Sequence, residues 1–330
     1  MDKNEQAIRE EILQILPIKM RQNFEKLFIS FLGLQEIRVR VGRPVILVYG
    51  GREFYLGRRE GLVHDKNNAF TADRRDMEEM MEYISNFSRY AYGEEMRQGF
   101  LTVQGGHRIG LAGQVVCRDG AVSGINHVTF INIRVSHEVK DCARGLMPFV
   151  IKDDMICNTL IISPPGCGKT TLLRDLVRCL SNGGKDLKGF TVGVIDERSE
   201  IGACYQGIPQ NDLGLRADVL DACPKAEGMM MMVRSMSPDI IAVDEIGGPE
   251  DIDALQYAMS CGIKLIATIH GSDMVKLRDK PVFGKLVKEK MFERYILLKH
   301  DEVGKIHAVF DERGSVLTGN KKPDMGERSA

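Results

Sequence analysis

The stretch IISPPGCGKTTLLRDLV at residues 161–177 combines residue types and spacings that suit the binding of phosphate. Gly166 and Gly168 precede Lys169 and Thr170, and this loop lies between an apolar run and a helical pattern. Glycine backbone N–H groups can close around phosphate oxygens, lysine can reach the β- and γ-phosphates, and a threonine hydroxyl can ligate Mg²⁺. The sequence therefore predicts a nucleotide-binding loop that uses ATP and Mg²⁺.

This motif differs from the pattern GxxxxGK[ST] at its first position, where Ser163 replaces the usual glycine. The first glycine belongs to the turn that leaves the strand, whereas the later residues surround the phosphate, so we expect the loop to bind nucleotide. We interpret Cys167 as a small loop residue. The predicted cofactor-binding residues are Pro165, Gly166, Cys167, Gly168, Lys169, Thr170 and Thr171.

A second apolar run, DIIAVDEIGG at residues 239–248, ends in two acids. Asp244 is predicted to hold Mg²⁺ together with Thr170, and Glu245 to orient or deprotonate the attacking water. Two solvated acids at a strand end are the alternative interpretation, which the nearby phosphate loop disfavours. The chain is therefore predicted to be an ATPase that produces ADP and phosphate.

Two further stretches supply candidate catalytic residues. FTVGVIDERSE ends in Asp196 and Glu197, with Glu200 one turn later; these acids could assist Mg²⁺ or water, or face solvent. IKLIATIHG ends in His270, which could sense the γ-phosphate or be an ordinary loop histidine. Ligands of open α/β sheets bind at the carboxyl ends of the strands, which is where these residues are expected.

The elements that must position these residues follow an alternating order. Residues 148–318 alternate apolar runs with helical patterns, which predicts an α/β domain with a mainly parallel sheet. A helix is predicted at 170–180, with Leu172, Leu173, Leu176, Val177 and Leu180 on its buried face. The predicted strands are 158–163, 189–195, 239–244 and 263–269.

The first part of the chain has a different pattern. Residues 1–147 begin with a helical pattern at 5–16, change to a period of two near Ile37, and return to a helical pattern at 73–85. They are therefore predicted to form a smaller α+β domain that precedes the α/β domain. The polar tail at 319–330 is predicted to be disordered.

Composition excludes several classes of protein. The 330 residues are 43% hydrophobic and carry a net charge of −1, which indicates a globular protein without a strong field for nucleic acid. The 8 cysteines show no CxxC or zinc-ligand spacing and are interpreted as reduced thiols. No signal peptide or run of membrane-spanning length is visible, so we expect a cytoplasmic protein that reaches a membrane only through partners.

The segment SMSPDIIAVDEIGGPEDIDALQYAMSCGIKLIATIHGSD resembles the Walker B to histidine-box region of the ATPases of type II and type IV secretion and pilus retraction. Their acidic box would fall on Asp196, Glu197 and Glu200. The stretches EIRVRVGRPV, GGHRIGLAGQVV, NIRVSHEVKDCARG and IDERSEIG resemble, more narrowly, the stage III sporulation protein AA family. The resemblance implies a RecA-like P-loop NTPase domain.

The resemblance also implies a setting and an assembly. It implies an ATPase on the mother-cell side of an endospore-forming bacterium, at the forespore-facing membrane, where it would serve as the motor of a secretion-like channel built by other sporulation proteins. Charge on the transferred phosphate normally needs an arginine, which secretion ATPases supply from a neighbouring subunit. A homo-hexamer is therefore expected, with Arg216, Arg234 or Arg134 as the candidate arginine.

Two other functions are compatible with the loop. A nucleic-acid-dependent ATPase has little support, because the arginines at 38, 40, 43 and 52 are better interpreted as the solvated face of a strand. A nucleotide-regulated scaffold with little turnover is disfavoured by the intact Lys169, Asp244 and Glu245. The methionine run at 229–232 is interpreted as adaptable packing.

Overall fold

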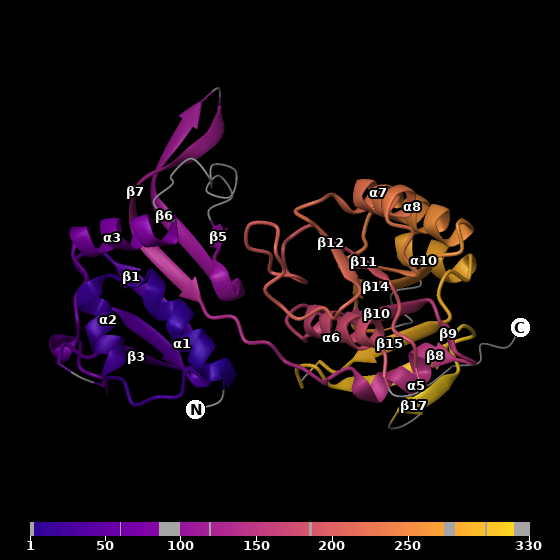
Figure 1. The fold of residues 1–330 in the computed structure, drawn as a ribbon, viewed down its shortest axis with the longest axis horizontal. Coiled ribbons are helices and arrows are strands. Elements are labelled where there is room, and N and C mark those ends of the chain that lie inside the picture. The colour runs from indigo at the N-terminus through magenta and orange to yellow at the C-terminus, as the bar shows by residue number, and fades with distance from the viewer. Residues whose placement is uncertain are drawn as a thin grey trace, which may run out of the picture. The chain divides into compact units, whose positions relative to one another are not determined.

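The computed structural model describes residues 3–59, 61–85, 100–118, 120–184, 187–273, 281–300 and 302–319. The chain divides into two compact units, Met1–His137 and Glu138–Ala330, each shown in Figure 1. This division precedes the predicted boundary after residue 147. The predicted tail lies outside the described residues, apart from Gly319.

Unit 1 is built on an antiparallel sheet with the strand order β4-β3-β2-β1-β7-β6-β5. Its helices are α1 (Lys3–Ile15), α2 (Ile18–Glu25) and α3 (Arg74–Ile84). A reciprocal capping box starts α3, because the Asp73 and Asp76 side chains each accept from the other's backbone N–H. The strands are β1 (Leu34–Arg40), β2 (Ile46–Tyr49), β3 (Arg52–Leu56), β4 (Leu62–Val63), β5 (Phe100–Thr102), β6 (Arg108–Arg118) and β7 (Ala121–Arg134), with short 3₁₀ turns at Phe31–Gly33, Lys66–Asn68 and Gln104–Gly106.

Unit 2 contains an eight-stranded sheet with the order β12-β11-β13-β14-β10-β15-β16-β17. The strands from β12 through β15 are parallel, and β16 and β17 continue the sheet in antiparallel fashion. They are β10 (Thr159–Ser163), β11 (Val192–Asp196), β12 (Ala217–Asp221), β13 (Ile240–Val243), β14 (Lys264–His270), β15 (Arg294–Leu298), β16 (Ile306–Asp311) and β17 (Val316–Gly319). The helices are α5 (Met147–Val150), α6 (Lys169–Asn182), α7 (Lys225–Ser235), α8 (Pro249–Ser260) and α10 (Pro281–Lys288); a 3₁₀ turn (Arg144–Leu146) and the small β8–β9 pair (Ile151–Lys152, Met155–Ile156) complete the unit.

Helices cover both faces of this sheet, which explains its apolar strands. Alternate residues of a strand point to opposite faces, so Leu160 and Ile162 of β10 pack into one apolar layer and Ile161 into the other. The first layer includes residues of α7, α8 and α10, and the second includes the leucines of α6 (Figure 1). Met229 and Met232 of α7 are buried in the first layer, which is the packing expected for part of the methionine run.

The parallel strands bring the candidate residues to one edge of the sheet. β10, β11, β13 and β14 all run in the same direction, so the loops that follow them emerge side by side. Within the described parts of the chain, no helix has the length and apolar character needed to cross a membrane.

Candidate nucleotide site

The phosphate loop connects β10 to α6 and depends on glycine at two positions. Gly166 has φ 74° and Gly168 has φ 88°, both in the left-handed region that side-chain-bearing residues rarely adopt. A Cβ on Gly168 would also lie 3.0 Å from the backbone nitrogen of Gly304, whereas one on Gly166 would meet no atom within 4 Å. Backbone conformation therefore requires both glycines, and close packing adds a second requirement at Gly168.

The turn between β15 and β16 supports this loop. Gly304 donates its backbone N–H to the carbonyl of Cys167 at 2.9 Å. The Cys167 sulfur lies 3.6 Å from the carbonyl oxygens of Pro165 and His300, and the residue is buried. Cys167 thus fastens the loop to a segment far along the chain, a role that its position in the motif did not indicate.

Ser163 occupies the last position of β10 and is fully buried. Its hydroxyl donates to the carbonyl of Pro164 at 2.8 Å, so the polar group is satisfied within its own turn. In the parallel register Ser163 lies opposite His270 of β14. The departure from the usual glycine therefore lies before the phosphate cradle and beside the strand that carries the candidate histidine.

Lys169 is the first residue of α6, and its side chain is nearly buried. Its ammonium group donates to Glu245 Oε1 and lies 3.5 Å from Nε2 of His270. These three predicted residues are therefore brought together at the carboxyl edge of the sheet.

Thr170 and Asp244, the predicted metal ligands, are hydrogen-bonded to each other: Thr170 Oγ1 donates to Asp244 Oδ2 at 2.6 Å. The other carboxylate oxygen of Asp244 accepts from the hydroxyl of Thr268 on β14. The same Thr268 hydroxyl accepts the backbone N–H of Glu245 at 2.9 Å. Sequence reasoning missed Thr268, which ties both acids of the second motif to the neighbouring strand.

Glu245 lies at the centre of the site and is held by three cationic or ionisable groups. Its Oε1 lies against Lys169 and 2.8 Å from Nε2 of His270, while its Oε2 is 2.8 Å from Nη1 of Arg198. Burial on its own would raise the pKa of Glu245, but the hydrogen bond and charge of Lys169, followed by the charges of His270 and Arg198, lower it. The carboxylate is therefore kept ionised beside the phosphate loop.

Asp196 has a supporting position rather than an open one. Its two oxygens accept three backbone N–H bonds, each 2.8 Å long, from Glu200, Ile201 and Gly202, and burial raises its pKa. From α6, Arg174 donates to the carbonyl oxygens of Glu200 at 2.7 Å and of Ile201 at 2.8 Å. Asp196 thus binds the N–H groups of the loop after β11, and Arg174 binds its carbonyl groups.

The other acids of that loop lie around the same small cleft. Glu197 accepts from the ammonium group of Lys225 at the start of α7. The cleft is lined by Asp196, Glu197, Arg198, Glu200, Lys225, Asp244 and Glu245. The predicted acidic residues are therefore gathered next to Asp244 and Glu245, with two cations that the sequence analysis did not single out.

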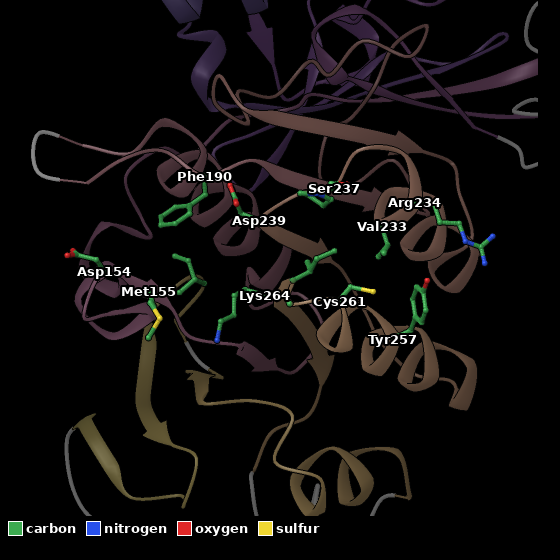
Figure 2. A pocket seen from close by; sticks show the side chains of 14 residues that line it. Asp154, Met155, Phe190, Val233, Arg234, Ser237, Asp239, Tyr257, Cys261 and Lys264 are labelled. Atoms are coloured by element: carbon green, nitrogen blue, oxygen red, sulfur yellow. The ribbon is translucent and has the colours of Figure 1, made fainter.

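The predicted transition-state arginines lie elsewhere. Arg216 immediately precedes β12, at the edge of the sheet opposite the phosphate loop, and its Nη1 donates to the carbonyl of Ser181 at 3.0 Å. Arg234 is in the last turn of α7 and lines a pocket formed by residues at the starts of β13 and β14; in Figure 2 its guanidinium points away from the other labelled side chains. Arg134 belongs to unit 1, where its Nε is 3.7 Å from Glu36.

The residues present fit ATP with Mg²⁺. The left-handed glycines at 166 and 168 turn the backbone into the start of α6, whose N-terminal N–H groups suit a bound phosphate. Mg²⁺ needs only one or two protein oxygen ligands when phosphates complete its shell, and Thr170 and Asp244 are placed to supply them. Among the described residues no cluster of three or more His, Cys, Asp and Glu could hold a metal ion without such help.

The fold is similar to those of a pilus retraction motor and of an ATPase whose structures have been solved. The structure of the pilus retraction motor PilT with bound ADP is similar at a TM-score of 0.56 and 13% identity, covering 94% of this chain and 84% of that chain. The Legionella pneumophila ATPase DotB is similar at a TM-score of 0.51 and 16% identity, covering 81% of this chain and 72% of that chain. The predicted RecA-like α/β fold, preceded by a smaller α+β domain, is confirmed.

The chain belongs to the family described as sporulation stage III, protein AA, whose model matches residues 6–317. Stage III sporulation protein AA of Bacillus subtilis (strain 168) is 40% identical over 310 residues, which cover 93% of this chain and 97% of that protein. The uncharacterized protein ycf45 of Cyanidium caldarium is 30% identical over 255 residues, covering 75% of this chain and 67% of that protein. The resemblance noted in the sequence is therefore confirmed.

Proposed function

We propose that this chain hydrolyses ATP with Mg²⁺ and couples hydrolysis to the work of a secretion-like channel in sporulation. The observation that carries the proposal is the convergence of Lys169, Thr170, Asp244 and Glu245 beside the phosphate loop. Membership of the sporulation family supports a role in sporulation. The similarity of the fold to that of a pilus retraction motor supports the coupling of nucleotide hydrolysis to mechanical work. We further propose a hexamer at the mother-cell side of the forespore-facing membrane, held there by channel proteins.

The contacts of the site indicate how its residues would act. When bound, Mg²⁺ supplies positive charge to the β- and γ-phosphate oxygens. Lys169 would exchange Glu245 for phosphate, because both are anionic partners within reach of the same loop. Glu245 Oε1 would then be free to accept a proton from the attacking water, with His270 beside it. Asp196 would act indirectly, through the loop that it shapes.

Two substitutions separate binding from hydrolysis. Lys169→Ala should lose nucleotide, because lysine neutralises phosphate in both the ground state and the transition state. Glu245→Gln should retain nucleotide but release phosphate at least about a hundredfold more slowly, which is the lower range for loss of a general base. Binding is measured with a fluorescent ATP analogue and turnover by phosphate release.

Each result has a contrary outcome. Turnover by Glu245→Gln at the wild-type rate would show that this carboxylate is not the base. Nucleotide binding by the wild type without any phosphate release would favour the nucleotide-regulated scaffold instead.

A further inference from the structure

Arg198, on the loop after β11, contacts the Glu245 oxygen that Lys169 does not contact. Its Nη1 is 2.8 Å from Glu245 Oε2, while Lys169 and His270 both lie against Oε1. The two carboxylate oxygens are thus divided between the nucleotide-binding lysine on one side and an arginine of the acidic loop on the other. Only 17% of the glutamate side chain is exposed, so its orientation depends mainly on these contacts with the protein.

The loop that carries Arg198 is fixed at both of its ends. Asp196, two residues earlier, accepts the backbone N–H groups of residues 200–202, and Ser199 donates its hydroxyl to Asp221 of β12. Arg174 binds the loop carbonyls from α6, the helix that begins at the phosphate loop. The backbone of Arg198 is therefore anchored to the same helix that carries Lys169, although 64% of its side chain is exposed.

Nucleotide binding would affect the two main cationic contacts of Glu245, those with Lys169 and Arg198, to different extents. The phosphates would compete for Lys169, and a partly buried carboxylate that loses one cation depends for its orientation on the contacts that remain. The other lysine that lines the cleft, Lys225, is already paired with Glu197. Arg198 is bound to the oxygen that Lys169 does not use, so its contact can persist when Lys169 moves.

We propose that Arg198 is a positioning residue that holds Glu245 by Oε2 and keeps Oε1 directed at the attacking water once nucleotide has drawn Lys169 away. This inference rests on the ATPase activity proposed above. It assigns to the acidic loop a cation acting within the same subunit, separate from any arginine supplied by a neighbour.

The test compares Arg198→Ala and Arg198→Lys with Arg313→Ala, an arginine whose side chain is 84% exposed on the turn after β16. Arg198→Ala should lower kcat about tenfold or more while ATP binding changes only a few-fold. The loss should be confined to kcat, because Arg198 is placed to orient the base rather than to bind nucleotide.

Arg198→Lys retains a cation and should restore part of the lost kcat, a recovery that a purely structural role would not produce. Arg313→Ala should match the wild type. In a Glu245→Gln background, adding Arg198→Ala should cause little further loss, because the arginine acts through the glutamate.

Three outcomes are distinguishable. A wild-type protein that releases no phosphate under any condition overturns the proposed function. An active wild type with Arg198→Ala unchanged in kcat overturns only the role of Arg198. Weakened ATP binding by Arg198→Ala in both the wild-type and Glu245→Gln backgrounds would mean that the arginine contacts phosphate, and would also overturn the positioning role.

Discussion

At the scale of single residues, Ser163 is where the phosphate loop departs from its usual pattern. Its hydroxyl is satisfied by the carbonyl of Pro164, and its backbone belongs to β10 rather than to the cradle. Ser163→Gly should therefore change kcat by less than about tenfold, equivalent to about 1.4 kcal/mol of barrier. Phosphate release at saturating ATP measures this. A much larger gain would mean that serine holds the wild-type loop in a poor conformation.

The motif residues of the site could be predicted because their spacing is local. Lys169 and Thr170 follow the glycines directly, and Asp244 ends its own apolar run, so each could be identified without knowing the fold. Thr268 and Arg198 could not, because their contacts with the acids of the second motif depend on which strands lie side by side. Apolar periodicity predicts a strand, but not its neighbour in the sheet.

At the scale of elements, four of the buried parallel strands were predicted (β10, β11, β13 and β14), whereas the buried strand β15 and the edge strand β12 were not. β10, β13 and β14 are continuous apolar runs, as expected when helices cover both faces of a sheet. β12 was not predicted, because ADVLD alternates apolar residues with aspartates at the edge of the sheet. β11 begins at Val192 rather than at 189, since the backbone N–H of Phe190 bonds to Leu180 instead of to a strand.

A second contact on α6 holds the segment that opens unit 2. The buried carboxylate of Asp175 accepts the backbone N–H groups of Asp141 at 3.0 Å and of Ala143 at 2.7 Å, and it pairs with Arg178. Arg178 also binds the side chain of Asp141 at 2.9 Å. The helix that begins at the phosphate loop therefore fixes residues 141–143 through both backbone and side-chain contacts.

Asp175→Asn should destabilise unit 2 by about 1–3 kcal/mol, the cost of weakening hydrogen bonds to a buried charged acceptor. Burial alone would raise the pKa of Asp175, but the hydrogen bonds from Ala143 and Arg178 outweigh burial and lower it. A lowered pKa contributes stability that is present above the unfolded-state pKa and lost as the pH falls through the folded-state value.

Urea unfolding at several pH values measures both effects. The variant should be less stable at neutral pH and should lose less stability on acidification than the wild type. Asp253→Asn is the matched control, because that carboxylate is 72% exposed and should have little effect. Equal pH dependence in Asp175→Asn and the wild type would contradict the assignment.

At the scale of the whole molecule, the placement of the arginines bears on assembly. Arg216 and Arg234 lie at the edge of the sheet opposite the phosphate loop of their own subunit. If either stabilises phosphate charge, it must do so in a neighbouring subunit, which requires the proposed ring.

Mixing two inactive proteins tests this requirement. Glu245→Gln should recover activity when combined with Arg216→Ala or Arg234→Ala, because some interfaces then join one intact glutamate to one intact arginine. Solution mass with and without ATP establishes the assembly state of each sample. Full activity in a strictly monomeric sample would exclude the ring.

The strand order of unit 2 also determines the stage of translation at which the nucleotide site can form. Among the described residues of unit 1, the paired strands lie between residues 34 and 134, so this sheet can form once that segment has left the ribosome. β10 instead lies between β14 and β15, and the loop after it is fastened to Gly304. The ribosome synthesises β14 and β15 more than a hundred residues after β10, the strand that they flank. Unit 1 can therefore fold before the strands that support the phosphate loop have been synthesised.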